Sequence, residues 1–498
     1  MKYNSVVISP AAARVTCFLG FLLASTPLWS LPADEARYLL NRTGFGASPS
    51  EIKGLENKSY EQAVHEIVHG SQSQPHTDPP SWVYQLPFPD TKPKDMTPEA
   101  RMAFEKQKQE ERMGLKAWWY QEMISTPSPF TERMTLFWHN HFTSSLEKVN
   151  APVLMYRQNL ILRQNALGNF RKLLTEMSRD PAMIIYLDTQ SNHRGHPNEN
   201  FARELLELFT LGEGHYTETD IKEAARAMTG WGVDYHYGIF TYHIGQHDNG
   251  EKTFMGQKGP WYGEDILRIV LTQPRVSEYI VEKLWREFIS ETPDPHEVQR
   301  LAALFRQNDY EIKPLLEALF LSPAFRDPKN RGVLTKSPVD LMVGTLRTFN
   351  TPIDDTRALV AAGRGMGQDI LDPPNVKGWA GGQRWISTST LLFRRQFLLR
   401  LLRGKEMETR PAPPSMAKAT MQEKPADVPG MDLNEWMGKA HIQNDQDLNK
   451  LIAILLPIPP VTPLAEHSDE AHHEHVGPEG SVVAEIRALV LDPAYQLE

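Results

Sequence analysis

Apolar positions recur with helical spacing through most of the chain. The stretch 99–124 starts polar and becomes apolar at its end, 130–232 contains helical segments with short loops between them, and 263–326 repeats the pattern. A period of 3.6 residues is typical of helices that bury one face. The 38 prolines limit helix length. The pattern predicts a mainly α protein, a large multi-helix globular body with Pro/Gly-rich loop insertions.

One segment departs from this pattern. Residues 233–259 are rich in aromatic residues and glycines, and they contain the dipeptide Asn249-Gly250. Asn-Gly is a strong signal for a tight hairpin turn. We therefore predict a small β-hairpin near 239–256, in which 239–247 pairs with 251–256.

The first thirty residues predict export. Lys2 and Arg14 supply positive charge, 15–24 is an apolar run of ten, and small and polar residues follow. This layout is typical of a secretory signal peptide over 1–30, and an amino-terminal membrane anchor is the alternative. We expect a periplasmic or extracellular protein. Cleavage would remove Cys17, the only cysteine, and would exclude disulfides and a thiol nucleophile.

The rest of the chain divides by composition. We expect a main helical domain at 34–405 and a low-complexity linker or loop, rich in Pro, Ala, Lys and Glu, at 406–432. A C-terminal segment follows at 433–498. It contains a His-rich mobile stretch at 467–475 and a final helix that we expect to pack back on the body.

The charge balance bears on the class of partner. The formal net charge is −9, and it becomes −11 once the two basic residues of the signal peptide are removed. Two predicted helices, 198–211 and 218–229, meet at a glycine turn as in a helix-turn-helix DNA reader. Export and an acidic balance argue against nucleic acid as a partner. No later stretch is long and apolar enough to cross a membrane.

The helix at 198–211 carries the first candidate chemistry. Its polar face includes Glu204, Glu207 and Arg203, and Arg203 has i,i+4 spacing to Glu199 and Glu207. A salt-bridged exposed face explains this pattern without chemistry. An apolar residue on the same face indicates partial cover, and a covered glutamate pair can bind a cation or share a proton. Glu204 and Glu207 are therefore candidate catalytic bases.

Histidines are the candidate metal ligands. His139 and His141, two apart, would point about 200° away from each other on one helix, and they can share a metal only where the helix ends. The polar run 143–145 predicts such an end. The alternative is one buried, hydrogen-bonded histidine and one exposed histidine. His243 and His247 have even spacing and share a face of a strand. His139, His141 and His247 are therefore the candidate ligands for a divalent metal ion.

The predicted hairpin adds acid–base candidates. His247, Asp248 and Lys252 lie beside aromatic residues and would form a rim for a polar substrate. In the simpler interpretation Asp248 only caps the turn and Lys252 is only solvated. We include all three as candidate catalytic residues.

Tryptophans in glycine-bounded loops are candidate substrate platforms. Trp379 lies in the Gly-rich loop 372–385, where the backbone can approach a ligand closely, and Trp231 follows the helix at 218–229. Together with Arg203 they form the predicted platform. The chain lacks a phosphate-binding P-loop, a Gly-x-Ser-x-Gly elbow and a His-Glu-x-x-His motif. These absences argue against the commonest serine hydrolases and zinc proteases.

Five motifs in order resemble one known family. They are "LLNRTGFGASPSEI" (39–52), "FWHNHFTSS" (137–145), "NENFARELLELFTLGEGHYTETDIKEAARAMTGW" (198–231), "HDNGEKTFMG" (247–256) and "PPNVKGWAGGQRW" (373–385). The chain resembles the bacterial domain-of-unknown-function family number 1800. The resemblance implies an exported, mainly helical protein, often encoded beside an exported family that is similar to sulfatases and alkaline phosphatases. It supplies no catalytic residues.

Two hypotheses therefore stand side by side. One is an exported metal-assisted hydrolase that acts on an envelope or extracellular polymer. The other is a non-enzymatic partner or scaffold for a co-exported sulfatase/phosphatase-like protein, with the same loops as the interface and tryptophans as anchors. Both expect the motif loops to converge on one face.

Overall fold

The computed structural model describes residues 30–403, 430–442, 447–462 and 481–498 of the 498-residue chain. The predicted signal peptide, apart from its last residue, lies outside the described residues. So do most of the predicted linker and the whole His-rich stretch.

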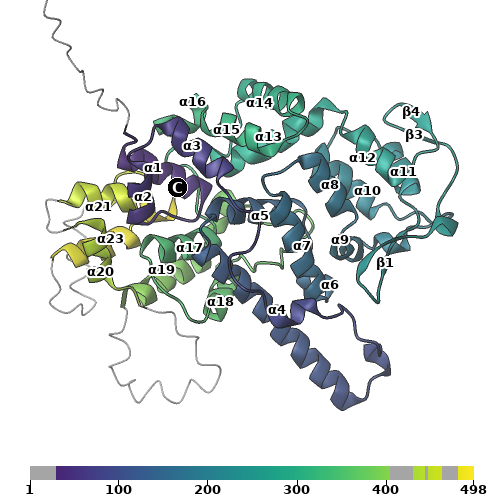
Figure 1. The fold of residues 1–498 in the computed structure, drawn as a ribbon, viewed down its shortest axis with the longest axis horizontal. Coiled ribbons are helices and arrows are strands. Elements are labelled where there is room, and N and C mark those ends of the chain that lie inside the picture. The colour runs from purple at the N-terminus through teal and green to yellow at the C-terminus, as the bar shows by residue number, and fades with distance from the viewer. Residues whose placement is uncertain (1–29, 404–429, 443–446, 463–480) are drawn as a thin grey trace, which may run out of the picture.

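Helices make up most of the described chain, as the sequence predicted (Figure 1). The helices of the first half are α1 (Ala33–Thr43), α2 (Pro49–Leu55), α3 (Tyr60–His69), α4 (Pro98–Ser125), α5 (Pro129–His141), α6 (Leu146–Val149), α7 (Pro152–Asn165), α8 (Phe170–Ser178), α9 (Pro181–Tyr186), α10 (Asn200–Glu204) and α11 (Glu218–Ala227). Those of the second half are α12 (Gly263–Val270), α13 (Pro274–Phe288), α14 (Pro295–Gln307), α15 (Ile312–Phe320), α16 (Pro323–Arg326), α17 (Pro338–Thr348), α18 (Arg357–Gly365), α19 (Thr388–Arg403), α20 (Leu433–Ala440), α21 (Leu448–Leu455) and α23 (Ser481–Leu491).

Helix starts follow the expected signals. Ser48 accepts from the backbone N–H of Glu51 and forms a capping box, with Pro49 in the first turn. Thr217 and Asp220 form a second capping box at the start of α11. In both boxes a hydroxyl residue lies three positions before an acidic residue, the spacing that favours this cap.

The strand pairing differs from the prediction. β1 (Trp231–Asp234) pairs with β2 (Ile239–Tyr242), and β3 (Lys252–Phe254) pairs with β4 (Gln257–Gly259). The predicted pairing of 239–247 with 251–256 is therefore wrong. Each observed hairpin has its own tight turn, the second at Met255 and Gly256, which both adopt positive φ angles (46° and 75°).

The helix predicted over 198–211 is also not a single α-helix. After α10 the chain forms a π-helical segment, η4 (Leu205–Thr210), and Leu211 N–H donates to Leu206 O over 2.9 Å. The wider turn changes the side-chain directions. Arg203 still pairs with Glu199 (3.2 Å), but its second partner is Glu218 (2.9 Å) and not Glu207.

The core is built around α5, which packs on α4 and α7. Arg163 of α7 and Glu132 of α5 form a buried two-pronged ion pair, with distances of 2.6 and 2.8 Å. Trp119 donates to the same carboxylate over 2.9 Å. Hydrogen bonds therefore satisfy the charges in this interior. α4 extends from this core as a projecting arm (Figure 1).

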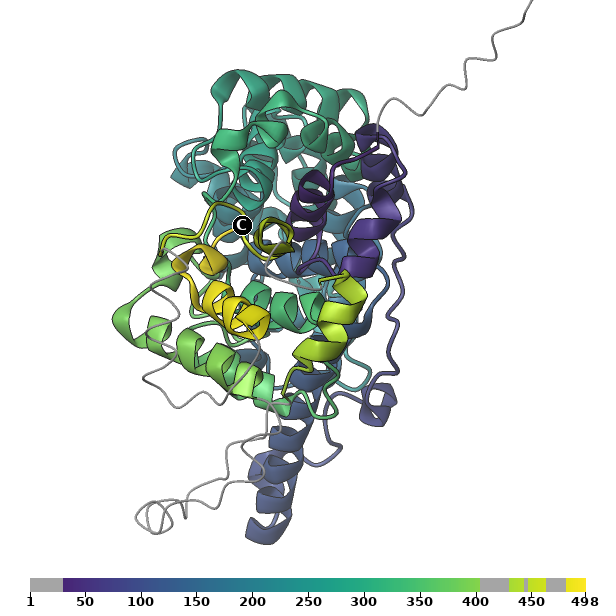
Figure 2. The same ribbon diagram turned by 90° about the vertical axis from the view of Figure 1, so that its left-hand side faces the viewer.

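The end of the chain closes one side of the body. α23 lies against α19 and α21, and Thr335 and Leu497 form an isolated β-bridge. Figure 2 shows these last residues, in yellow, beside the green helices. Within the described ranges, no helix combines the length and the apolar character needed to cross a bilayer.

Candidate active site

A cleft with a volume of about 830 Å³ lies among the described residues. Its walls come from α5, α13, the start of α17, the loop that precedes α19, and the last residue, Glu498. A volume of this size is typical of sites that enclose a small molecule or a few units of a polymer.

The end of α5 holds the Gly-rich loop in place. Asn140 Oδ1 accepts from the Trp379 N–H over 2.7 Å, and its amide donates to the Trp379 carbonyl over 3.3 Å. Gly378 has φ +78°, and a Cβ there would lie 2.2 Å from Asn140 Oδ1. His139 contacts the Trp379 ring with 5.8 Å between centroids. Two motifs far apart in sequence thus form one wall of the cleft.

The cleft contains a histidine–lysine pair. His141 Nε2 faces the Phe209 carbonyl oxygen at 3.1 Å, and Nδ1 lies 2.9 Å from Lys283 Nζ. Because a carbonyl oxygen can only accept, Nε2 carries the proton and Nδ1 accepts from the lysine. Burial, and secondarily the charge of Lys283, lower the pKa of His141 well below its usual value. A neutral imidazole therefore positions the Lys283 amine.

Lys283 itself has an altered acidity. Burial and the nearby Arg286 lower its pKa from 10.5 to about 7. The salt bridges found among the described residues include none to this lysine, although its Nζ lies 5.3 Å from the Tyr279 ring centroid. This lysine has no carboxylate partner and lies beside another cation, so near pH 7 its amine is neutral in about half of the molecules. Such an amine can act as a base or as a nucleophile.

A carboxylate lies one helical turn from this amine. Glu287 of α13 accepts from Arg133 Nε over 2.8 Å, and Arg133 also binds Asp340 (2.8 Å) and Glu498 (3.1 Å). Burial raises the pKa of Glu287, and the two neighbouring acids raise it further although Arg133 opposes them. Lys283 and Glu287 therefore have pKa values shifted toward each other, the pattern of paired acid and base groups in active sites.

The remaining charges of the cleft are mostly positive. Arg286, Lys377 and Arg384 are exposed cations that line it, and the exposed carboxylate is that of Glu291. Trp385 adds a partly exposed ring. The lining favours an anionic ligand with an apolar face, although the whole chain is acidic.

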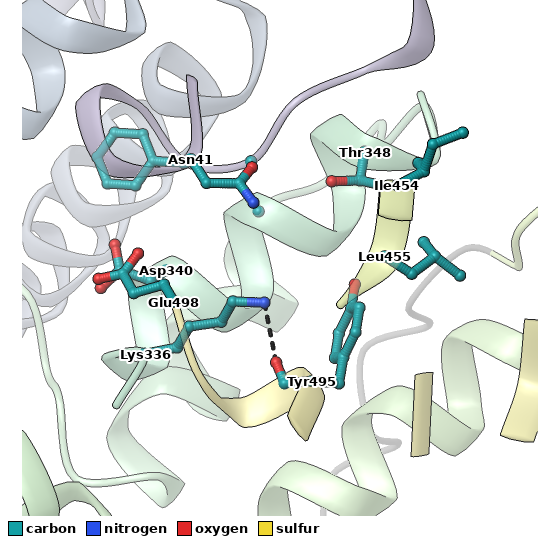
Figure 3. A pocket seen from close by; sticks show the side chains of 11 residues that line it. Asn41, Lys336, Asp340, Thr348, Ile454, Leu455, Tyr495 and Glu498 are labelled. Atoms are coloured by element: carbon teal, nitrogen blue, oxygen red, sulfur yellow. Dashed lines mark hydrogen bonds between the residues drawn. The ribbon is translucent and has the colours of Figure 1, made fainter. Parts of the chain in front are cut away.

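A second, much smaller cavity is lined by residues of α1, α17, α21 and the last residues of the chain (Figure 3). Its volume is about 20 Å³, enough for one water molecule. Lys336 Nζ donates to the Tyr495 carbonyl over 2.8 Å, and burial lowers its pKa to about 8. Asp340 and Glu498 line both cavities. This cavity is too small for an organic ligand, so the larger cleft is the candidate active site.

The predicted glutamate pair lies beside the cleft. Glu207 is 3.5 Å from Lys377 and accepts from the Tyr216 hydroxyl over 2.8 Å. Both glutamates are partly buried, and burial together with Glu207 raises the pKa of Glu204. Their link to the cleft is Lys377, and neither glutamate lines the cleft. The predicted platform residue Arg203 is partly exposed and forms the two ion pairs described above.

The other predicted acid–base residues form a separate cluster near α11. His247 Nδ1 lies 3.0 Å from the Thr229 carbonyl oxygen, and its ring stacks on Tyr262 at 4.5 Å. Asp248 pairs with Arg226 at 2.8 Å, and Lys252 donates to the Gly250 carbonyl over 2.9 Å.

Burial lowers the pKa of His247, and a hydrogen bond from Arg226 lowers that of Asp248. Trp231 is buried against Gly263. None of the predicted residues in this cluster lines the cleft, and Figure 1 places β1, β3 and β4 at the far end of the molecule from α19.

The predicted metal ligands do not come together. His139 is fully buried between Trp119 and Trp379, and its Nε2 has no hydrogen-bond partner. Burial lowers its pKa to about 4. His141 uses both ring nitrogens as described, and His247 lies in the other cluster. Among the described residues, three grouped metal-ligating side chains occur only in a different place, on α3 and α15.

Sequence reasoning missed Lys283, Glu287 and Arg133. All three lie in helices with ordinary amphipathic patterns, and their partners are far away in the sequence: His141 is 142 positions from Lys283, and Glu498 is 365 from Arg133. The sequence pattern predicted Trp379 as a substrate platform and not Trp385, but Trp379 is buried. The even spacing of His139 and His141 before a helix end, and Trp379 in the Gly-rich loop, pointed to this region.

The family model described as "Protein of unknown function (DUF1800)" matches residues 38–496. No curated protein and no solved structure shows significant similarity to the chain.

Proposed function

The chain belongs to the DUF1800 family, whose function is unknown, and we propose that it is a hydrolase with an acid–base pair on α13. The observation that carries the proposal is Lys283, an amine without an ion-pair partner that is half-neutral near pH 7 and faces a cleft of about 830 Å³. A partly buried amine without an ion-pair partner destabilises the fold, so its presence in a cleft favours a catalytic role.

The geometry supports a division of roles. Lys283 takes a proton from the attacking water, and His141 holds the amine in position through its Nδ1 atom. Glu287, whose pKa is raised, delivers a proton to the leaving group. The sequence predicted Glu204 or Glu207 as the base of a metal-assisted hydrolase. The cleft instead provides a lysine, and its described residues include no group of three metal ligands.

The lining supports an anionic polymer as substrate. Arg286, Lys377 and Arg384 offer positive charge, and Trp385 offers an aromatic surface for a sugar or other ring. We propose that the substrate is an acidic polymer of the cell envelope or its surroundings. This location agrees with the predicted signal peptide.

The experiment compares hydrolysis of anionic polymers (uronate-rich, phosphate-linked and sulfated) with that of neutral dextran, followed by size-exclusion chromatography. We expect an anionic polymer to be shortened at a rate that rises with pH through about 7. Lys283→Met should lower this rate by about 10²–10⁴-fold. Lys172→Met, on the exposed face of α8, is the matched control.

Two results would count against the proposal. Activity of Lys283→Met equal to that of the control would remove the lysine from catalysis. Failure of every anionic polymer to bind the wild-type protein would remove the substrate class.

A specific observation also favours the second hypothesis, that of a partner protein. The β1–β2 hairpin and the turn that follows expose Tyr235, Tyr237, Ile239 and Ile244, the last at 71%. Exposed apolar groups of this kind mark protein interaction sites. The test is binding of the co-exported sulfatase/phosphatase-like protein that the family resemblance implies. Ile239→Asp with Ile244→Asp should abolish binding, whereas Lys283→Met should leave it unchanged.

A further inference from the structure

A histidine pair and a glutamate meet on the surface, away from the cleft. His65 and His69 lie one turn apart on α3, and Glu317 projects from α15. Glu317 Oε1 is 3.2 Å from His65 Nδ1, and Glu317 Oε2 is 3.1 Å from His69 Nε2. The two rings stack with centroids 4.3 Å apart.

We propose that His65, His69 and Glu317 bind a divalent transition-metal ion of the zinc type. Two imidazoles and one carboxylate are a donor set that suits zinc and its neighbours, and they leave at least one coordination position open. The ion would connect α3 to α15, two helices that are more than 240 positions apart in the sequence. This inference does not depend on the proposed hydrolase.

The spacing of the donor atoms fits such an ion. With metal–ligand bonds of about 2.0–2.1 Å in a tetrahedron, neighbouring donor atoms lie roughly 3.3 Å apart. The two histidine–glutamate distances, 3.2 and 3.1 Å, are close to this value. Taking one donor atom from each of the three residues, these atoms all lie within 4.8 Å of one another. Small side-chain rotations would then complete the site.

The scaffold beneath the cluster is fixed. α3 packs directly on α15, and Val64, Val68 and Leu316 are fully buried. The Tyr60 hydroxyl also donates to the Phe320 carbonyl over 3.2 Å. Because the backbone positions are set by this packing, binding would require little ordering of the two helices.

The position at the end of α3 also favours a cation. His69 is the last residue of α3, and Gly70 follows as the C-cap. The carboxyl end of a helix carries partial negative charge, which attracts a positive ion. The side chains of His65 and Glu317 are 65% and 29% exposed, so the ion can enter from solvent.

The simpler interpretation is a hydrogen-bonded surface cluster with no ion, and a metal titration separates the two. Four histidines of the 467–475 stretch would bind metal on their own, so they are first changed to asparagine in every protein tested. Titration of this background protein with Zn²⁺, by calorimetry, should give one site per chain. Zn²⁺ should also raise the melting temperature.

The variants test the ligands one by one. His69→Asn should weaken Zn²⁺ binding by at least about a hundredfold, because loss of a direct ligand should exceed the 10–100-fold effect of losing an outer-shell partner. Glu317→Gln keeps the shape but replaces one ligand oxygen by an amide nitrogen that can only donate, and it should also weaken binding. His296→Asn, at an exposed histidine of α14, is the matched control and should bind as the background protein does.

Circular dichroism establishes that each variant is folded. Co²⁺ in place of Zn²⁺ should give visible absorption bands that disappear in the two site variants. Equal Zn²⁺ affinity in both site variants and the control would overturn the proposal, and so would absence of Zn²⁺ binding by the folded background protein.

Discussion

Replacement of Lys283 by methionine should stabilise the protein at neutral pH. The pKa of this lysine falls from 10.5 to about 7 on folding, and each pKa unit corresponds to about 1.4 kcal/mol. The full shift would therefore lower the free energy of unfolding at neutral pH by about 4–5 kcal/mol. Partial exposure of the side chain and loss of the hydrogen bond to His141, about 1 kcal/mol, reduce it. We expect the free energy of unfolding to rise by about 2–3 kcal/mol at pH 7.

The pH dependence gives this prediction its sign. The unfolded lysine keeps its proton up to about pH 10.4, whereas the folded one releases it near 7. Between these values the unfolded state binds more protons, so wild-type stability rises with pH. The penalty is fully present below about pH 7 and disappears near pH 10.5. Lys283→Met should lack this contribution, so its advantage should shrink as the pH rises.

The assay is urea unfolding followed by tryptophan fluorescence between about pH 6 and 10. Lys172→Met controls for the loss of a lysine at an exposed position, and it should follow the wild-type curve. A methionine variant that is less stable than wild type at pH 7, or one whose advantage does not change with pH, would refute the reasoning.

Three further changes test the structure around the cleft. Glu132→Gln should lower the free energy of unfolding by about 3–5 kcal/mol, because Arg163 loses its buried ionic partner; unchanged urea unfolding would contradict this. Gly378→Ala should cost about 1–3 kcal/mol and reduce polymer binding, because the new Cβ would meet Asn140; normal binding measured by calorimetry would contradict it. Burial raises the pKa of Asp180 to about 7, so wild-type stability should fall as the pH rises from about 4 to 7, and Asp180→Asn should remove this fall in urea unfolding.

Local features of the fold were predictable because they depend on neighbouring residues. Ser48 with Pro49 and Thr217 with Asp220 start helices, and each pair can be recognised from its spacing in the sequence. The hairpin pairing was not predictable in this way. Asn249-Gly250 is a strong turn signal in the sequence, but the turn that joins β3 and β4 is at Met255. Short strands give little periodicity with which to decide between two such turns.

The candidate site was predictable only in part. The pattern around His139 and His141 led to the correct end of α5, and Trp379 to the loop that contacts it. Lys283 could not be found, because its pKa depends on burial and on residues that are distant in the sequence. The position of Lys283 in the apolar pattern of α13 is that of an ordinary, partly exposed lysine. No neighbouring residue in the sequence distinguishes it from a lysine without a special role.

The most direct test of the central claim is the titration of the Lys283 amine itself. Lysine side chains labelled with ¹³C and ¹⁵N are followed by NMR as the pH is raised, and Lys283→Met identifies the signal. We predict a transition near pH 7 for this one signal, well below the value of about 10.4 that is usual for a lysine amine. A Lys283 signal that titrates above pH 10 would contradict this prediction.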